Sequence, residues 1–223
     1  MPPRPYDVVT FDCYGTLIDW EGGIREAFAT AALAIGAPID LVRVLERYAE
    51  VEPAVEAGPF MSYREVLTET ARRIAAALDW PLPEGRASFL AESLPAWRPF
   101  PDTNRALIAL GNAGYRLGIL SNVDDDLLVW TRRHLLAGFD LVVTAAQVQS
   151  YKPAPGHFTA AQALIGDRPW LHAAQSYFHD IAPARALGIP AAWINRKGER
   201  PSDGGAPDRM FSTLTGLADW LAP

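Results

Sequence analysis

Short apolar runs without polar alternation occur near the start of the chain and throughout its second half. Such runs are typical of parallel strands that are covered on both faces. Segments with helical spacing fill the intervals, and several end at a glycine that can adopt the left-handed C-cap conformation. This alternation predicts an α/β fold built on a Rossmann-like, doubly wound parallel sheet. The predicted strands are Val8–Phe11, Arg116–Leu120, Leu141–Thr144, Trp170–Ala174 and Ala191–Ile194.

The segment from residue 21 to residue 99 breaks this rhythm, because its apolar positions follow helical spacing only. Three helices are predicted there, over Ile24–Ile35, Asp40–Gly58 and Ser62–Leu78, and Ser62 with Glu65 forms a capping-box pattern. We therefore expect a core domain of residues 1–20 and 100–223. A helical cap subdomain, residues 21–99, is inserted between the first and second strands.

Size, composition and charge narrow the class of protein. The chain has 223 residues, of which 49% are hydrophobic and 21% charged, and this fits one globular α/β domain with an insertion. A net charge of −6 gives no basic footprint for nucleic acid, and no apolar run approaches the roughly 18 residues of a membrane span. A lone Cys13 and the lack of a signal-peptide pattern lead us to expect a cytoplasmic protein. The sequence leaves open whether the chain forms a homodimer.

Four polar motifs follow predicted strands, where open α/β sheets bind ligands. An Asp at such a strand end can act as a nucleophile or a metal ligand. Taken singly, each motif has a plain alternative as a turn residue, a helix cap or a surface lysine. The motifs are Asp12-Cys13-Tyr14-Gly15-Thr16, Ser121-Asn122, Ser150-Tyr151-Lys152-Pro153 and Ser176-Tyr177-Phe178-His179-Asp180.

Together and in this order, the four motifs resemble those of the haloacid dehalogenase-like hydrolase superfamily. Asp-x-Tyr-Gly-Thr is most similar to its 2-haloacid dehalogenase (type II) branch, and the helical insert resembles that family's cap. The resemblance implies a hydrolase that uses an aspartyl ester. Asp12 would be the nucleophile, and Lys152, Asp180 and Thr16 would complete the catalytic set.

Two positions separate phosphatases from dehalogenases in this superfamily. Phosphatase-like members carry a second Asp where this chain has Tyr14, and usually another where it has Ser176. Magnesium prefers carboxylate oxygens, and a leaving alkoxide needs an acid. Both losses favour a metal-independent reaction without a cofactor, in which a leaving group such as halide departs unprotonated.

The resemblance also suggests how a small carboxylic acid would be held. Hydroxyl groups of Thr16 and Ser121 could bind its carboxylate, and Asn122 could donate to the departing halide. Asp180 with Lys152 could activate water, and His179 could replace a water-positioning Asn that this chain lacks. Arg43 is the nearest candidate for the family's cap arginine, with Arg47 or Arg64 in reserve. The candidate substrate-binding residues are Tyr14, Ser121, Asn122, Trp20, Asp19, Arg43, Ser176, Tyr177 and His179.

The predicted reaction is conversion of an (S)-2-haloacid into a 2-hydroxy acid. Three alternatives remain open. A related hydrolase could open the C–N bond of a strained cyclic amino acid, with Asp19 facing the ring nitrogen. A small-molecule phosphatase could tolerate Tyr14. A non-catalytic binding protein could keep the fold, since fold does not fix function.

Overall fold

The central feature of the fold is a six-stranded parallel sheet with the strand order β3-β2-β1-β4-β5-β6. The computed structural model describes residues 4–201 and 205–222, so the first three residues of the N-terminal segment lie outside it. The strands are β1 (Val8–Phe11), β2 (Arg116–Ser121), β3 (Leu141–Thr144), β4 (Trp170–Ala174), β5 (Ala191–Ile194) and β6 (Arg209–Phe211). The predicted Rossmann-like α/β class is confirmed.

The five predicted strands are all present, and only β2 differs, by one further residue. The sixth strand, β6, was not predicted. It has three residues, two of them exposed, and it pairs only with β5 at the edge of the sheet. A short edge strand buries little, so its sequence carries no apolar run by which it could be recognised.

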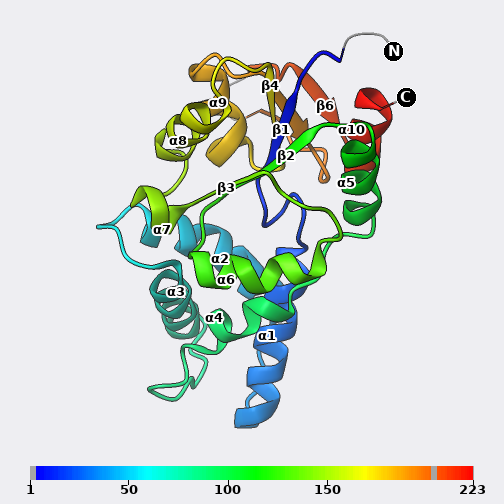
Figure 1. The fold of residues 1–223 in the computed structure, drawn as a ribbon. Helices are drawn as coiled ribbons and strands as arrows, with labels where there is room; N and C mark the ends of the chain where they lie inside the picture. The colour runs from blue at the N-terminus through cyan, green and yellow to red at the C-terminus, as the bar shows by residue number, and fades with distance from the viewer. Residues whose placement is uncertain (1–3, 202–204, 223) are drawn as a thin grey trace.

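Alternate residues of the strands pack into two separate layers of helices. Val9 and Phe11 of β1 belong to a cluster with α5 and α10, whereas Val8 packs with α8 and α9 on the other face. Figure 1 shows these two helix layers on opposite sides of the sheet. The core helices are α5 (Thr103–Asn112), α6 (Asp125–Thr131), α7 (Ala145–Val148), α8 (Gly156–Ile165), α9 (Ala182–Ala186) and α10 (Leu214–Leu221), with 3-10 turn η2 (Arg132–His134) and π turn η3 (Tyr177–Ile181).

A second body of helices lies beyond the end of the sheet towards which β1 runs (Figure 1). It consists of α1 (Trp20–Ile35), α2 (Leu41–Glu56), α3 (Tyr63–Ala77), α4 (Phe89–Ser93) and the 3-10 turn η1 (Leu94–Ala96). The capping box at Ser62 and Glu65 is present, whereas α4 was not predicted. We propose that residues 21–99 form the cap and that residues 1–20 and 100–223 form the core.

One side chain of the core holds the start of α3 in the cap. The Asp124 carboxylate accepts the backbone N–H groups of Tyr63 and Arg64, each at 2.9 Å. Arg64 also pairs with Asp126 at 2.7 Å. Asp124 therefore neutralises the N-terminus of a cap helix, although it stands at the N-cap position of α6.

No helix in the described part of the chain is long and apolar enough to cross a membrane.

Candidate active site

The candidate site lies where the chain reverses its direction of travel across the sheet. From β1 the chain passes to β2 and β3 on one side, and β4 then returns to the other side of β1. Such a switch point, at the carboxyl ends of the strands, is where open α/β sheets bind ligands. Asp12 follows β1 directly, and Gly15 turns the chain away with a φ of 100°, which L side chains rarely adopt.

Lys152 joins two carboxylates at this edge. Its Nζ donates to Asp12 Oδ1 at 2.9 Å and to Asp180 Oδ1 at 2.5 Å, and also to the Leu120 carbonyl at 2.9 Å. The Lys152 side chain is only 1% exposed. Residues 140 and 28 positions away in sequence are thus brought to one buried ammonium group.

These contacts set the charge states of the site. Burial lowers the pKa of Lys152, but the charges of Asp12 and Asp180 outweigh burial and hold it well above its usual value. Burial opposes ionisation of Asp180 too, yet Lys152 and His172 keep its pKa at about 2. Burial raises the pKa of Asp12, against the opposing charge of Lys152. A poorly solvated carboxylate is a better nucleophile than a hydrated one.

Thr16 fixes the orientation of the Asp12 carboxylate. Its hydroxyl donates to Asp12 Oδ2 at 2.8 Å and accepts the backbone N–H of Gln175 at 2.8 Å. Because Thr16 has one hydroxyl proton, it has none left for a substrate carboxylate. Its place is therefore that of a positioning residue for Asp12.

His172 holds Asp180 from behind, a role that the sequence analysis did not predict. His172 Nε2 lies 3.0 Å from Asp180 Oδ1, and His172 Nδ1 lies 2.9 Å from the Thr10 hydroxyl. Trp170 Nε1 donates to that hydroxyl, which can therefore donate to Nδ1. His172 Nε2 then donates to Asp180. The sequence feature that could have indicated this role is the position of His172 in β4, the strand beside β1.

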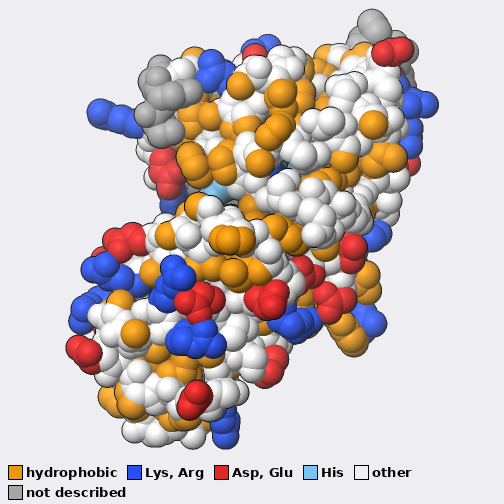
Figure 2. Space-filling model, turned by 90° about the vertical axis from the view of Figure 1, so that its left-hand side faces the viewer, with side chains coloured by type: hydrophobic (Ala, Val, Ile, Leu, Met, Phe, Trp, Pro, Cys, Tyr) orange, Lys and Arg blue, Asp and Glu red, His pale blue; other side chains and the backbone are white. Residues whose placement is uncertain are grey.

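A cavity of about 580 Å³ opens above Asp12, between the core and the proposed cap. Figure 2 shows a hollow between the upper core and the lower, charge-rich helical body. Asp12, Lys152 and Asp180 lie on its core side. The predicted site residues that line it are Asp12, Lys152, Asp180, Tyr14, Trp20, Ser121, Asn122, Ser176, Tyr177 and His179.

In the second motif, Ser121-Asn122, the serine hydroxyl is free to donate a hydrogen bond, whereas the asparagine amide already makes hydrogen bonds within the protein. Ser121 Oγ is buried and has no hydrogen-bond partner among the described residues. Asn122 Nδ2 donates to Glu56 Oε2 and to the Lys152 carbonyl, each at 3.1 Å, and Asn122 Oδ1 accepts the Lys152 N–H. Ser121 is thus the available donor, whereas the Asn122 amide predicted for the halide is already engaged.

The fourth motif faces the cavity through a π turn. Ser176 Oγ accepts the backbone N–H of His179 and lies 3.0 Å from His179 Nδ1. Burial lowers the pKa of His179, so its imidazole is neutral near pH 7.

The Tyr177 ring packs edge-on against Trp193, at a centroid distance of 5.1 Å. Tyr14 turns its hydroxyl towards Thr131, at 2.8 Å.

Besides Thr16, two predicted site residues do not line the cavity. Asp19 is the N-cap of α1 and accepts the Gly22 N–H at 3.0 Å. Arg43 is exposed on α2, two residues after that helix begins. The reserve arginines are also engaged elsewhere, Arg47 with Glu50 and Arg64 with Asp126.

The cap side of the cavity is acidic and aromatic instead. Helix α2 contributes Glu52 and Glu56 together with Tyr48, and α3 contributes Tyr63. The Tyr63 hydroxyl donates to Glu52 Oε1 at 3.0 Å and lies 3.2 Å from the Tyr48 hydroxyl. None of these four residues was predicted from the sequence to belong to the site. Their signal was a spacing of four along α2, which places residues 48, 52 and 56 on one face.

Both glutamates resist ionisation. Burial raises the pKa of Glu52 to about 7. Burial and the neighbouring Glu52 raise the pKa of Glu56 well above its usual value. His179 Nε2 lies 3.9 Å from Glu56 Oε2, which is too far for a hydrogen bond.

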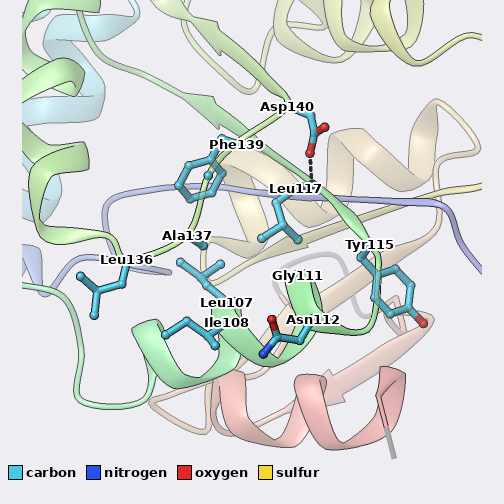
Figure 3. Close-up of a pocket in the computed structure, with 11 residues that line it drawn as sticks. Leu107, Ile108, Gly111, Asn112, Tyr115, Leu117, Leu136, Ala137, Phe139 and Asp140 are labelled. Carbon is cyan, nitrogen blue, oxygen red and sulfur yellow. Dashed lines mark hydrogen bonds between the residues drawn. The ribbon is translucent and has the colours of Figure 1, made fainter.

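A second hollow, between α5 and the segment before β3, carries no comparable chemistry (Figure 3). Its Asp140 carboxylate accepts the Leu117 N–H at 3.0 Å and is thereby used in the fold. Within residues 4–201 and 205–222, no three His, Cys, Asp or Glu side chains are grouped so that they could hold a metal ion. The predicted metal independence stays a prediction.

The buried lysine between two aspartates and the cavity above them form a candidate active site, in which a carboxylate could act as a nucleophile. A family model described as haloacid dehalogenase-like hydrolase matches residues 6–174. The chain belongs to this family and is an enzyme.

Several relatives of the chain are named as dehalogenases. It is 28% identical to (S)-2-haloacid dehalogenase H-109 from Pseudomonas putida, over 98% of this chain and 99% of the relative. It is 27% identical to haloacetate dehalogenase H-2 from Moraxella sp. (strain B), over 98% and 99% respectively. The crystal structure of an L-2-haloacid dehalogenase superposes with a TM-score of 0.81 at 27% identity, covering 97% of this chain and 99% of that one. These similarities support haloacid dehalogenation.

Proposed function

We propose that this enzyme replaces a leaving group at the α-carbon of a small carboxylic acid by hydroxyl, through an ester on Asp12. An (S)-2-haloacid is the first substrate class to consider, because the full-length relatives are named for it. The observation that carries the proposal is the buried Lys152 ammonium between Asp12 and Asp180. Its charge favours the ionised form of Asp12 and its hydrogen bond aligns the carboxylate, while burial removes water from it and opposes ionisation.

In the first step, one Asp12 carboxylate oxygen attacks the α-carbon. The new C–O bond forms as the carbon–halogen bond breaks, and halide leaves with the electron pair. The Ser121 hydroxyl, which has no partner among the described residues, is available for the substrate carboxylate. Thr16 holds the other Asp12 oxygen in place.

In the second step, water attacks the carbonyl carbon of the Asp12 ester and restores the carboxylate. The 2-hydroxy acid leaves with the original Asp12 oxygen. The water proton needs a base, and two groups line the cavity for it. Asp180 Oδ2 has no partner among the described residues, and neutral His179 stands beside it in sequence.

A single turnover in oxygen-18 water tests the ester. With enzyme in excess over 2-chloropropionate, we expect an unlabelled hydroxyl in the first-turnover lactate and one labelled oxygen on Asp12. Mass spectrometry of product and of the Asp12 peptide measures both. A labelled product hydroxyl would mean direct attack by water, and Asp12 would then be a general base.

The phosphatase alternative loses support at Tyr14. The Tyr14 hydroxyl is hydrogen-bonded to the Thr131 hydroxyl, so it does not serve as the acid that a leaving alkoxide needs beside Asp12. Opening of a strained cyclic amino acid is the second candidate. Asp19 does not serve it, because Asp19 caps α1, but Glu52 and Glu56 face the cavity where a ring nitrogen would need a negative charge.

A further inference from the structure

The charges on the two sides of the active-site cavity are arranged unequally. The cations that line it come from the core: Lys152, and Lys197 and Arg200 from the segment after β5. The charged residues that α2 places on the cavity are Glu46, Glu52 and Glu56. Among the residues that line the cavity, the cap contributes no Lys or Arg that could face a departing anion.

Glu52 is half-buried and the Glu56 side chain is almost fully buried, and neither carboxyl group has a cationic partner within hydrogen-bond distance in the described chain. Tyr63 donates to Glu52, and Asn122 donates to Glu56. Only 4% of the Glu56 side chain is exposed, and the imidazole of His179 lies 3.9 Å from it, beyond hydrogen-bond distance. Buried carboxylates are costly unless a cation or several donors compensate them. Glu52 and Glu56 lie together on the cavity wall without a compensating positive charge, and a cationic ligand could supply it.

The surrounding rings fit the same kind of ligand. Trp20 and Tyr48 both line the cavity, with their rings tilted at a centroid distance of 5.3 Å, and the Lys197 ammonium already lies 5.6 Å from the Trp20 ring. Aromatic faces beside carboxylates attract ammonium groups. On the core side, the unpartnered Ser121 hydroxyl is fully buried at the cavity floor and suits the opposite end of a ligand, a carboxylate.

We propose that the substrate of this enzyme is an α-substituted carboxylic acid that carries a second, cationic nitrogen, held by Glu52 and Glu56 on the cap. This inference rests on the proposed function for the reaction at the α-carbon. It adds the substrate class: a zwitterionic amino acid rather than a simple haloalkanoate. The acid end meets the core, and the ammonium end meets the cap.

A matched pair of product analogues tests the proposal without requiring turnover. 4-Amino-2-hydroxybutanoate and 2-hydroxypentanoate have the same chain length and differ by a terminal ammonium in place of methyl. By isothermal titration, we expect the wild-type enzyme to bind the ammonium compound at least about tenfold more tightly, as charge-assisted hydrogen bonds provide. Equal or weaker binding of the ammonium compound would overturn the proposal.

Variants assign the effect to the two glutamates. Glu52→Gln and Glu56→Gln keep the side-chain volume, and in each we expect the preference to fall to about threefold or less. Glu50→Gln is the control, because Glu50 is on the same helix but is exposed and pairs with Arg47. A tenfold preference that survives in both Glu52→Gln and Glu56→Gln would also overturn the proposal.

Turnover separates this inference from the proposed function. The chloro acids 4-amino-2-chlorobutanoate and 2-chloropentanoate form the corresponding substrate pair, and we expect kcat/KM to favour the first by at least about tenfold. Turnover of both acids at equal efficiency supports displacement at the α-carbon and counts against the ammonium site. Tighter binding of the ammonium product, with turnover of neither chloro acid, supports the ammonium site and counts against the proposed function.

Discussion

At the scale of single residues, the Asp12–Lys152–Asp180 contact concentrates most of the chemistry. Asp180 Oδ1 has two buried partners, Lys152 and His172, whereas its Oδ2 has none among the described residues. Asp12 also accepts a hydrogen bond from Lys152, through Oδ1, and its Oδ2 accepts one from the Thr16 hydroxyl. The two aspartates thus have different surroundings, and only Asp12 stands at the end of β1 where the cavity opens.

Replacing Asp12 by Asn should abolish turnover while leaving the fold intact. An amide is a poor nucleophile, so we expect activity below about one hundredth of wild type. The fold should persist because Lys152 keeps Asp180 and the Leu120 carbonyl as partners. Initial rates, with circular dichroism as a check on folding, measure this. Mass spectrometry must exclude deamidation to Asp, and residual activity above that level would remove Asp12 from its role.

The sequence predicted the core half of the cavity far better than the cap half. Asp12, Ser121, Lys152 and Asp180 follow strands, and the parallel topology brings strand ends together whatever the details of packing. Glu52 and Glu56 lie within a helix, where their direction depends on how α2 is rotated against the core. That rotation is set by tertiary packing, which a single sequence does not specify. For the same reason Arg43 was assigned to the cavity but lies outside it.

At the scale of secondary-structure elements, the junction between the proposed cap and the core depends on one helix start. The N-terminus of α3 has free N–H groups, and the carboxylate of Asp124 reaches from the core to accept two of them. By sequence alone, Asp124 with its neighbours Asp125 and Asp126 fits the start of its own helix, α6, because the helix dipole favours acidic residues there. A carboxylate that caps a helix other than its own cannot be recognised without the tertiary structure.

Asp124→Ala should weaken this junction. Loss of a helix-capping carboxylate typically lowers the free energy of unfolding by about 0.5–2 kcal/mol. We expect a loss in this range, with a higher KM because α3 carries Tyr63 into the cavity. Urea unfolding and steady-state kinetics measure the two effects. Asp126→Ala is the matched control: its exposed pair with Arg64 should be worth less than about 1 kcal/mol. Equal effects of the two variants would contradict the role of Asp124.

At the scale of the whole molecule, the cavity sets a relation between ligand binding and stability. The enzyme buries carboxyl groups on both sides of one space but has a buried lysine only on the core side. The core carboxylates are compensated within the protein. The cap carboxyls, Glu52 and Glu56, are not, so they oppose folding whenever they ionise without a bound cation.

Glu52→Gln should therefore change how the free energy of unfolding depends on pH. Burial raises the Glu52 pKa from 4.5 to about 7, so between these values the folded state binds more protons than the unfolded state. Stability contributed by the protonated group is then lost as pH rises from about 4.5 to 7. This loss amounts to at most about 3 kcal/mol, and less because the Glu52 side chain is partly exposed.

The variant lacks this titration, so its stability relative to wild type should increase between pH 5 and pH 8, by about 1–3 kcal/mol. Urea unfolding at the two pH values, without ligand, measures the change. Glu50→Gln should follow wild type at both, because its carboxyl group is exposed on the same helix. If the difference between Glu52→Gln and wild type were the same at pH 5 and pH 8, Glu52 would titrate as it does in the unfolded chain. The cap wall would then carry a full negative charge at neutral pH even without a ligand.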